Sequence, residues 1–127
     1  MSFANILAVG IGAAIGAWLR WILNINFSES MFAFPLGTLI SNLVGGLLMG
    51  LALGIFTLGF VANQEARLFI TTGLLGGLTT FSTFSAEAVA LIEKKQLDIL
   101  FLHLSSHVLG SIMMTMIGIK LAQLIFK

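Results

Sequence analysis

The stretch GGLTTFSTFS, residues 76–85, interrupts a segment of the chain that is otherwise strongly apolar. It combines two glycines with five residues that carry a side-chain hydroxyl group. Glycine is a weak helix former, and serine and threonine side chains compete for the backbone hydrogen bonds of a helix. The backbone groups freed by a broken membrane helix are tolerated only where protein or water surrounds them. We therefore predict a helix over residues 66–93 that breaks at this stretch, in preference to a continuous helix whose hydroxyl groups bond back to their own turns.

The composition of the whole chain indicates a membrane protein. Of the 127 residues, 58% are hydrophobic and only 9% are charged, and the mean hydropathy is +1.09. A soluble domain carries roughly a quarter of charged residues, so most of this chain must face lipid or other apolar side chains. The absence of cysteine excludes disulfides and thiolate metal sites. A net charge of +1 gives no reason to expect a nucleic-acid partner.

Polar turns divide the chain into four apolar spans, each close to the roughly 20 residues that cross a bilayer. The predicted turns are residues 24–30, 59–67 and 93–98, and the predicted helices are residues 3–23, 35–58, 66–93 and 99–126. The expected fold is an all-α membrane protein, one domain over residues 1–127, with its third helix broken in mid-membrane. Glycines at four-residue spacing, which let helix backbones approach closely, predict tight packing. They are Gly12 and Gly16 in the first span and Gly46, Gly50 and Gly54 in the second.

The basic residues are divided evenly between the two ends of this bundle. Lys and Arg in excess on one side normally fix the orientation of a membrane protein. Here one face carries Arg67, Lys120 and Lys127, and the other carries Arg20, Lys94 and Lys95. One interpretation is that the chain inserts either way up, so that opposed copies pair as an antiparallel dimer. The other is that a few charges near helix ends mislead the count.

Two features of the third span favour an ion site at its break. Glu87 is the only acidic side chain within the apolar part of this span, so a cation at the break would be bound by backbone oxygens. Phe81 and Phe84 are three residues apart and share one helical face. Packing alone explains such a pair, but the positive edges of aromatic rings can also meet an anion.

The second and fourth spans also carry polar residues, and we expect these to face the interior of the bundle. Asn42 in the second span is either interhelical glue or a hydrogen-bond donor to an anion. His103, His107, Ser111 and Thr115 recur every four residues and form one stripe, which faces protein or water. Two histidines at this spacing with no third ligand nearby do not predict a metal site.

These residues exclude some functions and leave others open. The serines lack a placed base and acid, so we do not expect an enzyme. The functions that remain open are those of a channel, a transporter and a purely structural protein. Glu87 and His107 would allow a proton-coupled exporter. A small dual-topology multidrug exporter is less favoured, because the first span carries Arg20 and no acidic residue.

Three motifs resemble the Fluc family of fluoride channels, also called CrcB. They are GIGAAIGAWLRW (residues 10–21), GTLISNLVGGLLMG (37–50) and GLLGGLTTFSTFSAE (73–87). The third motif is the most specific, and the resemblance covers all four spans. It implies an antiparallel dimer with two pores in a bacterial inner membrane, which exports fluoride passively from the cytoplasm. One chain carries all three of the matching pore residues, Asn42, Phe81 and Phe84, which favours a homodimer over a heterodimer.

The resemblance also implies roles for individual residues. A structural Na⁺ would be bound at the dimer axis by the carbonyls of Gly76 and Thr79. Phe81 and Phe84 would line the pore with their ring edges, and Asn42 would match the pore asparagine of the family. The remaining ion-pathway residues would be Ser82, Thr83, Ser85, His107, Ser111 and Thr115. Arg20 would lie at an entry vestibule, and Thr38 and Glu87 near a pore end. His107 stands where the family often has a tyrosine or another polar residue.

Overall fold

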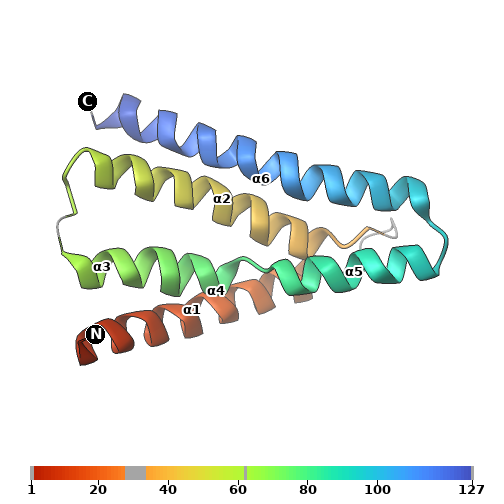
Figure 1. Cartoon of the computed structure of the whole chain (residues 1–127), viewed down its shortest axis with the longest axis horizontal. Coiled ribbons are helices and arrows are strands. Elements are labelled where there is room, and N and C mark those ends of the chain that lie inside the picture. The colour runs from red at the N-terminus through yellow and green to blue at the C-terminus, as the bar shows by residue number, and fades with distance from the viewer. Residues whose placement is uncertain (1, 28–33, 62, 127) are drawn as a thin grey trace.

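The computed structural model describes residues 2–27, 34–61 and 63–126, and these residues form a bundle of long helices (Figure 1). α1 (Phe3–Phe27), α2 (Leu36–Thr57) and α6 (Leu97–Ile125) are continuous. The third span consists of α3 (Gln64–Leu68), a π-helical segment (Phe69–Leu75), α4 (Gly76–Leu78) and α5 (Phe81–Glu93). Each of the four spans is long and apolar enough to cross a membrane. The predicted all-α architecture with an interrupted third span is therefore confirmed.

The first helix is longer than the sequence analysis predicted. α1 continues to Phe27, through the first part of the turn expected at residues 24–30, whose other residues lie outside the described part of the chain. Arg20 is thus about two turns from the end of α1. Its Nε donates a hydrogen bond to the Gly77 carbonyl oxygen at 3.1 Å, so the side chain has a partner on the third span. The other helix boundaries agree with the predicted ones to within two residues.

The break in the third span is two residues long. Thr79 (φ −84°, ψ 157°) and Thr80 (φ −151°, ψ 124°) are extended, whereas α4 ends before them and α5 begins after them. Thr80 is the N-cap of α5, since its Oγ1 accepts a hydrogen bond from the Thr83 amide at 3.2 Å. Figure 1 shows this extended link near the middle of the span, at the junction of α4 and α5.

The helices pack in two pairs. α2 lies along α6, and α1 lies along the first half of the third span (Figure 1). At Gly50 an added Cβ would overlap the Thr115 carbonyl oxygen, and at Gly118 it would overlap that of Leu47. At Gly77 it would come within 2.5 Å of the Ala13 carbonyl oxygen. Both pairs are therefore held with their backbones in contact, as small residues at membrane helix interfaces allow.

The connectivity places the two described chain ends at the same end of the bundle. The N-terminal start of α1, the C-terminal end of α6 and the turn between α2 and α3 lie together at this end (Figure 1). The turn between α5 and α6 lies at the opposite end. This is the arrangement expected of four spans joined by short connections.

Candidate functional site

A groove runs beside the break, along α2 and α6. Its volume is about 380 Å³, and it is open to the outside of the bundle because Phe81, Val108 and Ile112 on its rim are at least half exposed. It is lined by Asn42, Gly45, Gly46, Met49, Thr79, Thr80, Phe81, Phe84, His107, Val108, Ser111, Ile112 and Thr115. No Lys, Arg, Asp or Glu is among these lining residues. The groove is therefore neutral in formal charge but rich in polar groups.

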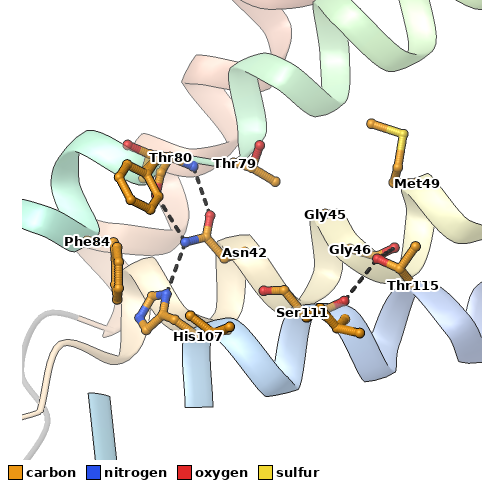
Figure 2. Close-up of a pocket in the computed structure, with 13 residues that line it drawn as sticks. Asn42, Gly45, Gly46, Met49, Thr79, Thr80, Phe84, His107, Ser111 and Thr115 are labelled. Atoms are coloured by element: carbon orange, nitrogen blue, oxygen red, sulfur yellow. Dashed lines mark hydrogen bonds between the residues drawn. The ribbon is translucent and has the colours of Figure 1, made fainter. Parts of the chain in front are cut away.

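Asn42 ties the break to α6. Its Nδ2 donates to the Thr80 carbonyl oxygen at 3.0 Å and lies 3.1 Å from His107 Nδ1, and its Oδ1 accepts from the Thr80 amide at 2.8 Å. Figure 2 shows the Asn42 side chain directed at the break, between Thr80 and His107. Both hydrogens of the Asn42 amide are thus used within the chain. Because Asn42 donates to Nδ1, the imidazole of His107 carries its hydrogen on Nε2.

Thr80 is a polar groove residue that the sequence analysis did not single out. It is buried, and its backbone makes both hydrogen bonds to Asn42. Its hydroxyl caps α5 and lies 3.2 Å from the hydroxyl of Ser82. A threonine directly before a run of helix-compatible residues is an N-cap signal, which could have identified it.

Most other hydroxyl groups near the groove are bonded to their own helices. Thr79 donates to the Leu75 carbonyl oxygen at 2.9 Å, and Ser85 donates to that of Phe81 at 2.8 Å. Thr115 is shared between the carbonyl oxygens of Gly46 (3.1 Å) and Ser111 (2.9 Å). Within the described part of the chain, the Ser111 hydroxyl has no such partner. Ser111 is therefore a groove hydroxyl with an uncommitted hydrogen.

The two phenylalanines of the break differ in their surroundings. Phe84 is buried, with its ring 5.0 Å from that of His103 and 4.7 Å from that of His107 between centroids. Phe81 is 77% exposed, and its ring packs on Phe84 at 5.4 Å. The pair thus forms one wall of the groove, with Phe84 fixed by its neighbours and Phe81 projecting outward.

A second polar cluster lies on the other side of Phe84. Thr38 Oγ1 donates to Glu87 Oε1 at 2.5 Å, and Glu87 Oε2 is 3.8 Å from Nε2 of His103. The same His103 nitrogen is 3.1 Å from the Phe84 carbonyl oxygen, so it donates there. Ligand atoms of Glu87, His103 and His107 all lie within 4.8 Å of one another. The expectation that the two histidines have no third ligand nearby was therefore wrong, because α5 brings Glu87 to them.

The remaining predicted site residues lie outside the groove. Thr38, Thr83 and Glu87 line a smaller cavity of about 260 Å³ with Asn24, Phe27, Pro35 and Gly37. Ser82 is exposed on the first turn of α5. Ser85 lies on the next turn, and Arg20 is bound to the carbonyl of Gly77.

Two carbonyl groups at the break have lost the donors that a continuous helix would give them. The Thr80 amide, which would reach the Gly76 carbonyl, donates to Asn42 instead. The Thr83 amide, which would reach the Thr79 carbonyl, donates to the Thr80 hydroxyl instead. Gly76 is exposed on the outside of the bundle. These two carbonyl oxygens suit a cation with little preference for charged ligands.

Comparison with known families matches residues 7–119 to the family described as "CrcB-like protein, Camphor Resistance (CrcB)". The chain belongs to the CrcB family. It is 52% identical to the fluoride-specific ion channel FluC of Ralstonia pickettii (strain 12J) over 118 residues, 93% of this chain and 94% of that protein. It is 48% identical over 119 residues to the FluC protein of Nitrosospira multiformis, 94% of this chain and 93% of that protein. CrcB relatives are named as ion channels, so the predictions of this family and of a protein that is not an enzyme are confirmed.

Proposed function

We propose that the chain forms a passive, fluoride-selective channel that exports fluoride across a bacterial inner membrane. The observation that carries this proposal is the neutral groove beside the break. Fluoride binds water strongly, so a narrow path must replace that water with other donors. The Ser111 hydroxyl and the ring edges of Phe81 and Phe84 can replace the water around fluoride. None of these groups carries a fixed charge, and a fixed charge would hold the ion too tightly for conduction. The names of the CrcB relatives support the same ion.

The first prediction is selective flux through the purified protein. Liposomes that contain the protein should release fluoride down its gradient, with chloride release no faster than from empty liposomes. The measurement uses fluoride and chloride electrodes with the same vesicles. Equal flux of the two anions would refute the selectivity, and fluoride release that stops when a proton gradient is collapsed would indicate a proton-coupled exporter instead.

We further propose that two antiparallel copies form the functional unit, with one pore along the groove of each. A single bundle leaves the polar groove and the freed backbone of the break on its outer surface, where lipid offers no hydrogen bonds. A second copy packed against this surface would cover them. The even division of basic residues is consistent with insertion in both orientations.

The second prediction tests this assembly in cells. Reporters fused to the C-terminus, one active only in the cytoplasm and one only in the periplasm, should both give signals. The expected signals are of similar size, because one sequence inserts both ways up. A fusion that reports one side only would contradict an antiparallel homodimer.

We also propose a structural Na⁺ between the two copies, bound by the Gly76 and Thr79 carbonyl oxygens of each. Such an ion supplies a fixed positive charge that satisfies the carbonyls of the break. A ligand that binds only the folded assembly raises its stability as RT ln(1 + [L]/Kd).

The third prediction is therefore that the unfolding temperature in detergent rises with Na⁺ concentration. The comparison is with N-methylglucamine at equal ionic strength, which is too large for such a site. Identical unfolding temperatures in the two salts at every concentration would refute a structural sodium ion.

A further inference from the structure

The cluster of Glu87, His103 and His107 contains three ligand atoms that nothing in the described chain satisfies. Glu87 Oε2, His103 Nδ1 and His107 Nε2 are buried and have no hydrogen-bond partner. His103 is 0% exposed and His107 is 4% exposed. In native proteins a buried polar atom without a protein partner commonly holds an ion or a water molecule. We propose that these three residues form a binding site for a divalent transition-metal ion such as Zn²⁺.

The donor set fits zinc in both kind and number. Two imidazoles and one carboxylate are a ligand set of zinc sites that keep a fourth position open. Ligand atoms in a tetrahedral zinc site are about 3.4 Å apart, given metal–ligand distances near 2.1 Å. Here one ligand atom from each of the three residues lies within 4.8 Å of the other two, so a metal ion requires only a modest approach of the side chains. Nitrogen ligands also disfavour Mg²⁺ and Ca²⁺, which prefer oxygen.

The outer hydrogen bonds of His103 and Glu87 are of the kind that hold metal ligands in place. A histidine that binds a metal usually donates its other N–H to a carbonyl or carboxylate, which fixes the ring. His103 does this, since its Nε2 donates to the Phe84 carbonyl oxygen and leaves Nδ1 free. Glu87 is held in the same way through Oε1, which accepts from Thr38, while Oε2 remains free. Two of the three ligands are therefore already held by a second contact.

The cluster also has an access route. Glu87 lines the cavity of about 260 Å³ near the start of α2, and its side chain is 21% exposed. His107 lines the groove on the other side. A metal ion that entered through the cavity would stand between that cavity and the groove.

His107 couples this site to the groove. Its Nδ1 accepts a hydrogen bond from Asn42, so its hydrogen is on Nε2. Coordination through Nε2 requires this hydrogen to move to Nδ1, which can then no longer accept from Asn42. Metal binding and the Asn42–His107 hydrogen bond exclude each other.

This coupling gives zinc an inhibitory role, a consequence that rests on the proposed fluoride channel. One carboxylate leaves a bound Zn²⁺ with a net positive charge beside the groove. A fixed charge near the path holds an anion instead of passing it on, and the loss of its bond to His107 loosens Asn42. Zinc is therefore expected to slow fluoride flux.

The test is isothermal titration calorimetry with ZnCl₂ on the full chain, purified without a tag. Wild type should bind one Zn²⁺ per chain, and MgCl₂ at the same concentrations should give no binding heat. E87Q and H103Q should each weaken zinc binding by at least about tenfold. The matched control is E93Q, because Glu93 is an exposed carboxylate at the end of the same helix. Wild type that does not bind zinc, or an H103Q protein that binds it as tightly, would overturn the site.

Two further measurements keep the proposal testable if a variant does not fold. X-ray absorption of zinc-loaded wild type should show only nitrogen and oxygen ligands with two imidazoles, and a spectrum without imidazole overturns the site. In liposomes, zinc should slow fluoride release by wild type and have less effect on H103Q. Zinc binding by a wild type that passes no fluoride would refute the channel and leave the metal site standing.

Discussion

Replacing Asn42 with alanine is expected to lower fluoride flux by about 100-fold or more. The substitution leaves the amide and carbonyl of Thr80 and the Nδ1 of His107 without the partner they share. Each unpaired buried group costs about 1–3 kcal/mol, and about 1.4 kcal/mol at a barrier is a factor of ten in rate. The break would relax from its extended geometry, and His107 would no longer be held in one tautomer. Fluoride efflux from liposomes at matched protein density measures the effect.

Ser41 is the matched control for this substitution. It is the neighbour of Asn42 on α2 and is 0% exposed, but its hydroxyl donates to the Gly37 carbonyl oxygen of its own helix. Ser41→Ala removes a buried polar group without touching the break, so its flux should stay within about a factor of two of wild type, since such back-bonding adds little. Size-exclusion profiles and helical content separate loss of flux from loss of fold. An Asn42→Ala protein that conducts at more than half the wild-type rate would show that Asn42 has no role in the path.

Replacing Phe81 with isoleucine is expected to lower fluoride flux by about tenfold, although the ring contributes little to the fold of one chain. A pair of aromatic rings gains about 0.5–1.5 kcal/mol beyond its buried area, and a ring-edge contact of similar size with fluoride corresponds to a factor of up to about ten in rate. Phe81 is 77% exposed in the single bundle, so its loss should leave helical content and monomer stability unchanged. Phe84→Ile should lower flux by a similar factor. It should also lower stability, because the ring is stacked on His103 and contacts His107.

The matched control for Phe81 is Phe101→Ile. Phe101 lies on α6 and is 74% exposed, but it does not line the groove. Its replacement removes a phenyl ring of similar exposure and should not change flux. Full flux from both Phe81→Ile and Phe84→Ile would mean that these rings only fill space.

The fold was largely predictable because its signals are local. Four long apolar runs and the polar turns between them define the spans, and the double glycine with its hydroxyl neighbours marks the break. The end of α1 was not predictable in the same way. Arg20, with Trp18 and Trp21 beside it, has the composition of a membrane interface. The helix nevertheless continues to Phe27, and Arg20 donates to the Gly77 carbonyl oxygen, 57 residues further along the chain, which the local composition does not reveal.

Several of the predicted residues line the groove, but the sequence did not predict their contacts. Spacing placed Phe81 with Phe84 and aligned the polar stripe of the fourth span. It could not show that Asn42 uses both amide hydrogens on Thr80 and His107, because these partners are 38 and 65 residues away. Contacts between spans depend on how the helices are placed against each other, and a pattern within one helix does not contain that information.

The contact between α2 and α6 has a consequence for size discrimination. Gly46 and Gly50 place the backbone of α2 directly against the carbonyl groups of Ser111 and Thr115. Side chains that form a constriction can change rotamer and let a larger ion through, but two touching backbones have no such freedom. The wall of the groove that α2 and α6 form is therefore positioned by main-chain contacts. A path along so stiff a wall would widen for a larger anion such as chloride only by movement of the side chains opposite it.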